Sequence, residues 1–539
     1  MSLKKSSGRD QKLAKEKIMH LSLKDLRESG ALDDLKSIKR GIEKESLRVD
    51  SQGSISKKKH PDKLGSALTN SFITTDFSEA LLELVTPTFT DTQSCLDFLT
   101  NLHSFVHQSI DKELLWPMSM PCSIGSNEEV AIGEYGSSNS GTMKSVYRKG
   151  LAHRYGSKMQ AIAGIHYNFS FPDRFFEKIA DFRGLTNQGL KDMKSDIYLS
   201  MARNFRRYEW LYFLLFGASP AFSDTFTEKN LDRFEKLPKG SCFQKHATSL
   251  RMGDLGYISE IQDNLNISIN SIEEYIQDLK NALTKPHIEY KNIGEFLDGE
   301  RIQLNSSVIQ IENEYYSTIR PKRTCPSGER PINILRSQGI EYLELRCVDL
   351  DPFSPIGIDR NQIDFLDIFL LLCLTKESPP LDKRENQYLK ENHKRIVNYG
   401  RKPDIKIYSE QDEVMVSDLA NTLLQEMNEI VEEAEGGLFR KKNNPWRESL
   451  QIQKEKIEDL NLTPSGRLIE RLIRDNLSHE ELCLEIAKSN ATFFENYNSS
   501  REEEFKQEAS LSKERQKKIE SEKSLPFEEY LTEFLNKVS

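Results

Sequence analysis

The segment Gly41–Val49, with the sequence GIEKESLRV, most constrains the fold because its residues alternate along the chain. An alternation with a period of two residues predicts a β-strand with one buried face. Glu43 and Glu45 are two positions apart, so their carboxylates project to the same side of the strand, about 7 Å apart. A carboxylate in a sheet interior is unfavourable unless it is paired or binds a metal ion. The sequence therefore predicts partners for both carboxylates.

Further acidic residues occupy comparable positions. Glu83 lies in SEALLELVTP, Glu344 lies in IEYLELRCV, and Asp76 lies in the turn-like TTDFSEA. His166 lies in GIHYNFSF, on the same predicted strand face as Asn168. A single acidic residue of this kind is more often solvent-exposed or in a salt bridge, and a single histidine is more often structural. All of them together predict a divalent-cation site, because cations relieve the repulsion between clustered carboxylates.

The metal is not identified by these residues alone. Magnesium prefers oxygen ligands, whereas an imidazole also suits manganese and zinc. Cationic residues accompany the acidic ones, and arginine beside metal-binding carboxylates is typical of phosphoryl transfer. These residues are Arg148, Arg251 and Arg346, together with Arg320, Lys322 and Arg323, which we assign to nucleotide binding. The sequence contains no GxxxxGK[ST] phosphate loop and no GxGxxG after a strand, so it predicts an ATP-using enzyme that holds its nucleotide by metal and sheet.

Composition excludes several other classes of protein. The chain has 539 residues and a net charge of −9, which disfavours general binding to nucleic acid or membrane surfaces. Its most apolar stretches, 210–216 and 368–374, are much shorter than the roughly 20 residues of a membrane helix. The seven cysteines are widely spaced and form no CxxC motif. We expect a soluble, cytoplasmic protein with reduced thiols.

The pattern along the chain predicts a mixed α and β body followed by a helical region. Predicted helices cover 10–40, 91–112 and 197–216, and predicted strands cover 41–49, 78–87, 164–171, 308–316 and 340–348. After about residue 380 the sequence is charged and helical in pattern, and 500–523 is predicted to be a solvated helix. We expect a basic N-terminal extension at 1–20, a catalytic body at 21–380 and a mainly helical C-terminal region at 381–539 packed on that body.

Several long blocks identify a family resemblance. They include GIEKESLRV, GSALTNSFITTDFSEALLELVTP, GIHYNFSFP, ATSLRMGDLGY, QIENEYYSTIRPKR and GIEYLELRCVDLDPFSPIGI. In order and spacing, from about residue 35 to 360, they resemble the proteobacterial-type glutamate–cysteine ligases. The resemblance implies an α+β, glutamine synthetase-like fold in which a curved, mostly antiparallel sheet forms a funnel backed by helices. It also implies ATP-dependent ligation of L-cysteine to the γ-carboxylate of L-glutamate through γ-glutamyl phosphate, the first step of glutathione synthesis.

The resemblance also implies roles for particular residues. It places two or three magnesium ions, or manganese, on Glu43, Glu45, Asp76, Glu83, His166 and Glu344. Arg251 and Arg346 match residues that bind the transferring phosphoryl group, and Arg148 either joins them or holds the glutamate. The residues that match the cysteine pocket are Phe77, Tyr147, Leu151, Gln160, Tyr257 and Tyr316. A monomer with feedback inhibition by glutathione is the family's further implication.

Two alternatives remain beside this assignment. One is a related ligase that joins glutamate to a different amine. The other is a catalytically silent, metal-binding relative, because a fold alone does not establish an activity. A bifunctional glutathione-making enzyme is disfavoured, because the charged helical region after residue 380 does not have the character of a further ATP-using domain.

Overall fold

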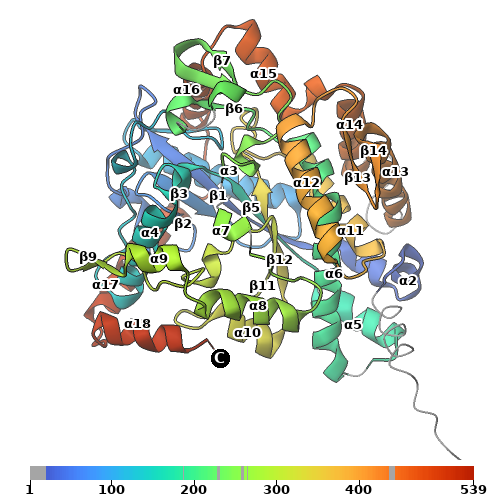
Figure 1. Ribbon diagram of the computed structural model, residues 1–539, viewed down its shortest axis with the longest axis horizontal. Coiled ribbons are helices and arrows are strands. Elements are labelled where there is room, and N and C mark those ends of the chain that lie inside the picture. Colours follow the sequence, from blue (N-terminus) through green and yellow to red (C-terminus); the bar gives the residue numbers. More distant parts are fainter. Residues whose placement is uncertain are drawn as a thin grey trace, which may run out of the picture.

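A computed structural model describes residues 20–185, 187–227, 231–256, 260–263, 265–435 and 444–538. Its centre is a seven-stranded sheet with the strand order β11–β12–β5–β1–β3–β2, in which β4 also pairs with β1 (Figure 1). Each strand pair of this sheet is antiparallel. The strands are β1 (Lys39–Val49), β2 (Ile73–Thr75), β3 (Leu81–Val85), β4 (Leu114–Leu115), β5 (Ile165–Ser170), β11 (Ile319–Lys322) and β12 (Tyr342–Val348).

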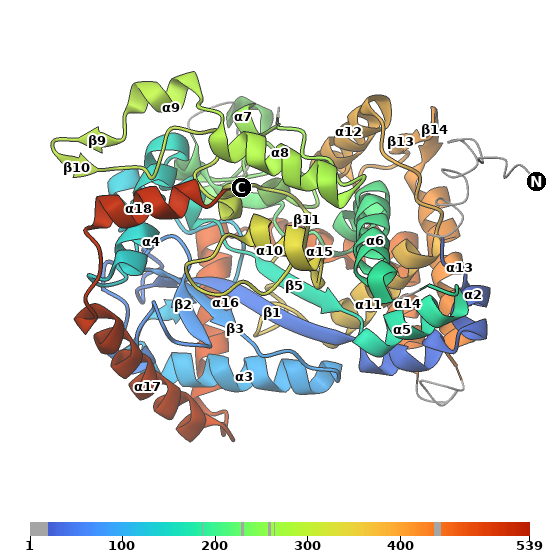
Figure 2. The ribbon, with the colours of Figure 1, turned by 90° about the horizontal axis from the view of Figure 1, so that it is seen from below.

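Helices cover one face of this sheet, which we call the back face. They are α3 (Thr92–Ser109), α6 (Asn187–Phe216) and α11 (Arg360–Thr375), and Figure 2 shows α3 beneath β1 and β3. Asp367 of α11 connects this layer to the sheet: it forms an ion pair of 2.5 Å with Arg40 of β1 and accepts the Tyr167 hydroxyl of β5 at 2.7 Å. The back faces of the two central strands are therefore fixed to one helix.

Further elements surround the opposite face and the ends of the sheet. The helices among them are α2 (Leu23–Glu28), α4 (Asn139–Tyr155), α5 (Asp173–Phe182), α7 (Glu260–Asp263), α8 (Ile272–Thr284), α9 (Ile288–Ile293) and α10 (Pro331–Gln338). Two small sheets consist of β6 (Ala221–Ser223), β7 (Glu235–Leu237) and β8 (Ser241–Phe243), and of β9 (Phe296–Leu297) with β10 (Glu300–Arg301). In Figure 2, α8 and α9 lie on the side of the sheet opposite α3.

The C-terminal elements pack on this body. The helices are α12 (Lys383–Tyr399), α13 (Val416–Ala434), α14 (Pro445–Glu458), α15 (Pro464–Arg474), α16 (His479–Glu495), α17 (Glu502–Ser521) and α18 (Phe527–Asn536), and the hairpin is β13 (Lys406–Ser409) with β14 (Asp412–Met415). Helix α12 contacts α6, α13 and α14 contact α11, α16 and α17 contact α3, and α18 contacts α4. Helix α12 lies against α6 at the outside of the molecule, on the side opposite α3 (Figure 2).

The predicted helix over 10–40 is wrong for the part that the structure describes. Residues 1–19 lie outside the described residues. Helix α2 begins at Leu23, because Ser22 and Asp25 cap it reciprocally, and it covers only six residues. Gly30 then has a φ of 72°, in the left-handed region, so the chain turns before a short 3₁₀ segment at Ala31–Ser37 and enters β1.

The predicted strand over 308–316 is also wrong. This segment contains a 3₁₀ turn, Glu312–Glu314, and the strand begins only at Ile319. Glu312 pairs with Arg330 at 3.0 Å, and Glu314 pairs with Arg154 at 2.9 Å. These buried ion pairs satisfy carboxylates that a strand would have directed elsewhere, and they hold the segment in an irregular conformation.

The predicted solvated helix over 500–523 exists as α17, but one of its faces is buried. Phe505, Ala509 and Ser512 are buried, and the Ser512 hydroxyl accepts the backbone N–H of Ser66 at 3.0 Å. The chain passes so close at Gly65 that an added Cβ would collide with the backbone of Ala509. Helix α17 is therefore part of the wall beside α3 and not a free charged helix.

The other predicted elements are confirmed as β1, β3, α3, β5, α6 and β12, all within a few residues except α6, which begins ten residues earlier than predicted. All seven cysteines lie among the described residues and are free thiols, and six of them are buried. Among the described helices, none combines the length and the apolar character that a membrane crossing requires.

Candidate active site

A cavity of about 400 Å³ opens on the face of the sheet opposite α3. Strands β1, β3, β5 and β12 and helix α4 contribute its walls, so residues from distant parts of the chain meet there. All six predicted metal ligands line the cavity: Glu43, Glu45, Asp76, Glu83, His166 and Glu344. The strand face predicted from GIEKESLRV is therefore the floor of a cavity.

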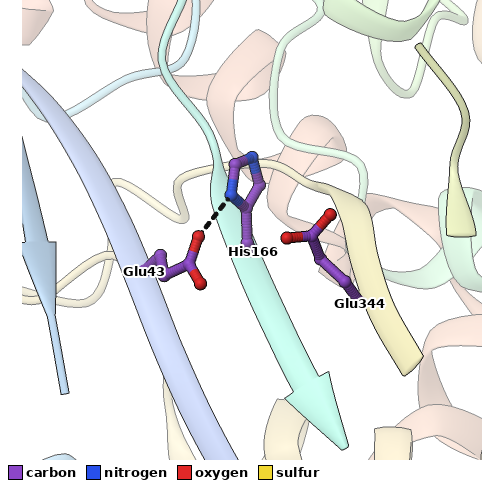
Figure 3. A group of neighbouring side chains, drawn as sticks. All are labelled: Glu43, His166 and Glu344. Carbon is purple, nitrogen blue, oxygen red and sulfur yellow. Dashed lines mark hydrogen bonds and ion pairs between the residues drawn. The ribbon is translucent and has the colours of Figure 1, made fainter. Parts of the chain in front are cut away.

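Strand register brings these side chains together. Glu43 lies opposite His166 in the β1–β5 pair, and Glu45 lies opposite Glu83 in the β1–β3 pair. Figure 3 shows Glu43 and His166 directed toward one another with Glu344 of β12 beside them. One ligand atom from each of these three residues lies within 4.8 Å of the others. Ligand atoms this close together are compatible with a single metal ion.

Neighbouring groups orient these ligands. His166 Nδ1 lies 2.9 Å from Glu43 Oε2, and the Asn168 amide donates to Glu43 Oε1 at 2.9 Å. The backbone N–H of Gly164 donates to Glu45 Oε2 at 2.7 Å, which leaves Glu45 Oε1 3.7 Å from His166 Nε2. Such supporting contacts hold a carboxylate in one orientation before a cation binds.

Charge repulsion is concentrated on the β1–β3 side of the cavity. Burial, together with the nearby Asp76 carboxylate, raises the pKa of Glu45 to about 7. Burial and the carboxylates of Glu43, Asp76 and Glu45 hold the pKa of Glu83 well above its usual range. These groups ionise together only if positive charge enters the cavity, and a divalent cation supplies it.

Cationic side chains compensate the charge on the β12 side. Glu344 is buried, but Lys322 at 3.2 Å and Arg346 at 3.2 Å hold its pKa well below the usual range. Burial lowers the pKa of Arg346, but the carboxylates of Glu344, Glu45 and Glu43 outweigh it and raise that pKa. Glu344 is therefore ionised and available as a ligand, and Arg346 is oriented toward the cluster.

Arg251 lies beneath the cluster in a short 3₁₀ turn, Leu250–Met252. Its guanidinium donates to the Arg346 carbonyl at 3.1 Å and lies 3.4 Å from Asp349. An added Cβ at Gly164 would collide with this guanidinium, so only glycine fits at that position of the strand entry. The two arginines are thus connected through one backbone carbonyl.

Arg148 extends from α4 over the opposite wall. Its guanidinium donates to the Asp76 carbonyl and to the Lys144 carbonyl, the latter at 3.0 Å. It also lies 4.4 Å from the centre of the Tyr135 ring. These contacts attach the turn that contains Asp76 to α4, the helix that contains some of the residues predicted for the cysteine pocket.

The residues predicted for the cysteine pocket are largely brought together. Phe77, Tyr147, Leu151, Gln160 and Tyr316 line the cavity, and burial raises the pKa of Tyr316 to about 12. Tyr257 lies outside the described residues. Within this cavity wall, apolar and hydroxyl groups are combined, which suits a small polar side chain.

The three residues predicted for nucleotide binding are separated. Lys322 lines the cavity beside Glu344. Arg320 does not line it, and its guanidinium donates to the Asn313 carbonyl at 3.0 Å near the Tyr315 ring. Arg323 instead donates to Gln338 and Gly339 carbonyls at 3.0 and 3.2 Å, at the C-terminal end of α10. That contact satisfies free carbonyl groups of the helix end.

Sequence reasoning missed several residues of the cavity wall, among them Lys144, Gln262 and Glu314. Lys144 lies one helical turn before Arg148, so the spacing of α4 contained the signal. Burial, together with the neighbouring Arg148, lowers the pKa of Lys144 to about 8. Glu314 and Gln262 had no such signal, because they lie on irregular or very short elements. Their contacts join distant segments: Gln262 donates to the Glu314 carbonyl at 2.9 Å.

Known proteins resemble this chain in sequence and in fold. A family model described as glutamate-cysteine ligase matches residues 23–396. A glutamate–cysteine ligase of Alcanivorax borkumensis is 44% identical over 85% of this chain and 88% of its own. A glutamate–cysteine ligase of Francisella tularensis, solved in complex with AMP, is 35% identical with a TM-score of 0.86, over 93% of this chain and 97% of its own. A bifunctional glutathione synthetase of Pasteurella multocida is 25% identical with a TM-score of 0.66, over 86% of this chain and 54% of its own.

The fold and the cavity together define an ATP-dependent ligase. The predicted α+β, glutamine synthetase-like fold with a mostly antiparallel sheet is confirmed by the structural match and by the sheet itself. The chain belongs to the glutamate–cysteine ligase family. The resemblance read from its sequence blocks is confirmed.

Proposed function

We propose that this ligase joins the amine of L-cysteine to the side-chain carboxylate of L-glutamate at the cavity on β1, β5 and β12. The observation that carries the proposal is the convergence of the six predicted ligands and three arginines in one cavity. Family membership supports the assignment of glutamate and cysteine as substrates, because the relatives are named glutamate–cysteine ligases.

The residues present fit a magnesium site. Glu43, His166 and Glu344 would hold one ion, and Glu45, Asp76 and Glu83 would hold one or two more, with manganese as the alternative. Four of these side chains are Glu, whose hard oxygen donors suit magnesium, and the raised pKa of Glu83 reflects a need for positive charge. When bound, the ions would neutralise the triphosphate and favour transfer of its terminal phosphoryl group to another anion.

The reaction requires two steps at the glutamate side chain. An oxygen of the γ-carboxylate attacks the γ-phosphorus of ATP, ADP leaves, and γ-glutamyl phosphate forms. The neutral amine of cysteine then attacks the acyl carbon, and phosphate leaves with that carboxylate oxygen while the amine loses a proton. Arg251 and Arg346 would bind the migrating phosphoryl group and the charge that develops on it.

Substrate positions follow from the remaining walls. Arg148 would hold the glutamate or join the other two arginines, and Lys322 would contact the nucleotide phosphates. Phe77, Tyr147, Leu151, Gln160 and Tyr316 would enclose the cysteine. We further propose feedback inhibition by glutathione, which combines both amino-acid subsites in one molecule, and a monomeric enzyme in the cytoplasm.

The direct test is ADP release by the purified protein with ATP, Mg²⁺ and L-glutamate, with and without L-cysteine, and with the product identified by mass. The proposal expects cysteine-dependent ADP release and γ-glutamylcysteine. Turnover with 2-aminobutyrate but not with cysteine would assign a different amine acceptor. Absence of turnover with any amine would leave a silent metal-binding relative.

A further inference from the structure

A chain of buried polar contacts approaches the active-site arginines from behind. His393 of α12 lies between two acceptors: its Nε2 is 2.8 Å from the Met252 carbonyl oxygen, and its Nδ1 is 3.1 Å from a Glu209 carboxylate oxygen on α6. The other oxygen of Glu209 accepts the Thr318 hydroxyl at 2.5 Å. The Thr318 carbonyl in turn accepts the backbone N–H of Arg346 at 2.9 Å.

The first of these contacts acts on the residue next to Arg251. Met252 ends the same 3₁₀ turn, and its sulfur lies 3.4 Å from the Arg251 guanidinium and 3.2 Å from the Tyr316 hydroxyl. The carbonyl that His393 binds therefore belongs to the short backbone unit that carries one active-site arginine and supports one pocket tyrosine.

His393 itself is not part of the active-site cavity. It lines a second cavity of about 470 Å³, whose wall includes Met252 and Tyr316. The edge of its ring packs against Phe213, at 4.9 Å between ring centres and 83° between ring planes. The imidazole is thus fixed on the far side of the wall and reaches the reaction only through the backbone.

The two contacts of His393 are made by different ring nitrogens. The Met252 carbonyl oxygen can only accept, so His393 donates to it from Nε2. Substitutions can separate the two contacts, because a glutamine amide reaches about as far as Nε2 and an asparagine amide about as far as Nδ1.

We propose that His393 is a positioning residue that holds the Leu250–Met252 turn so that Arg251 meets the transferring phosphoryl group. This inference rests on the proposed function of Arg251. A displacement of about 1 Å at a group that stabilises a transition state can reduce the rate by about 100-fold, even when the cause lies far from the reacting atoms. Residues of α12, beyond the predicted catalytic body, therefore contribute to the chemistry.

The test compares His393→Gln, which keeps a donor for Met252, with His393→Asn, which loses it. We expect His393→Asn to lower kcat for cysteine-dependent ADP release by about 10- to 100-fold, with KM for ATP and glutamate changed by less than about threefold. His393→Gln should retain kcat within about threefold of wild type. Gln244→Ala is the matched control. It removes a different hydrogen bond to α12, from the Gln244 amide to the Asn398 carbonyl at 2.9 Å, and should leave kcat unchanged.

A double-mutant cycle with Arg251→Ala tests the route of the effect. If His393 acts through Arg251, His393→Asn should change kcat by less than about threefold in the Arg251→Ala background. A full loss in that background, equal losses in the Gln and Asn variants, or an unaffected His393→Asn enzyme would overturn the inference while the proposed function stands. Wild-type protein without cysteine-dependent turnover, or Arg251→Ala with wild-type kcat, would overturn both.

Discussion

Glu43 and His166 face each other directly across the β1–β5 pair, with His166 Nδ1 2.9 Å from Glu43 Oε2. The pairing depends on register, because a slip of one residue would turn Glu43 to the back face of the sheet. On that face Arg40 and Tyr167 are held by Asp367 of α11. The helical layer behind the sheet therefore fixes which strand face carries the metal ligands.

Removal of one ligand charge should abolish most of the turnover. We expect Glu43→Gln and Glu344→Gln each to lower kcat by at least about 10- to 100-fold while the protein remains folded, because glutamine keeps the shape but not the charge. Cysteine-dependent ADP release at saturating ATP and Mg²⁺ measures the effect. Glu300→Gln, which removes an exposed charge paired with Lys149, is the control. Unchanged activity in both cavity variants would contradict the metal-cluster assignment.

Arg251 should act on the transition state more than on substrate binding. Its contacts to a migrating phosphoryl group form late in the reaction, so Arg251→Ala should lower kcat by about 100- to 1,000-fold. KM for ATP should change by less than about tenfold. Steady-state kinetics with varied ATP separates the two parameters, and a change confined to KM would assign Arg251 to ground-state binding.

A substitution of Leu151 should change the kinetics for the amine substrate and not those for glutamate or ATP. It lines the cavity from α4, so Leu151→Ala should lower kcat/KM for cysteine by about 10-fold, since a few methylene contacts are worth that much. KM for glutamate and ATP should remain near wild type. The control is Val146→Ala on the same helix: Val146 packs with Leu304 and Leu531 on the other side. If Val146→Ala lowers kcat/KM for cysteine as well, the effect of Leu151→Ala would reflect a general disturbance of α4.

Asp364 should make stability depend on pH. Burial and the neighbouring Asp367 raise its pKa to about 6 from a usual value of 3.8. The folded protein therefore binds this proton more tightly, and its stability falls as pH rises between about 4 and 6. Above this window the cost reaches about 3 kcal/mol, which Asp364→Asn should remove. Urea unfolding of both proteins from pH 4 to 7 measures the difference. A constant difference between them would contradict the shifted pKa.

The alternating segments were the predictable part of the fold. β1, β5 and β12 have polar residues every second position and form the cavity floor, whereas α4 was not among the predicted helices. The period of two follows from local chain geometry, so short patterns were sufficient to predict which residues share a strand face. The metal-ligand candidates came from the same patterns, and the structure brings them together.

Contacts between distant irregular segments were not predictable. The 308–316 segment looks like a strand, but ion pairs with Arg154 and Arg330 hold it in another conformation. The hydrogen bond between His393 and the Met252 carbonyl joins residues 141 positions apart. Neither residue lies in a local sequence pattern that indicates this contact. Such contacts depend on the packed tertiary structure, which overrides local preference.

Oxygen transfer from glutamate tests the central claim most directly. L-Glutamate labelled with ¹⁸O in its side-chain carboxylate would be incubated with ATP, Mg²⁺ and L-cysteine, and the released phosphate analysed by mass. An acyl phosphate formed at this cavity predicts one ¹⁸O in each phosphate, together with unlabelled ADP. Unlabelled phosphate, or label recovered in AMP, would contradict phosphorylation of the γ-carboxylate at the metal-ligand cluster.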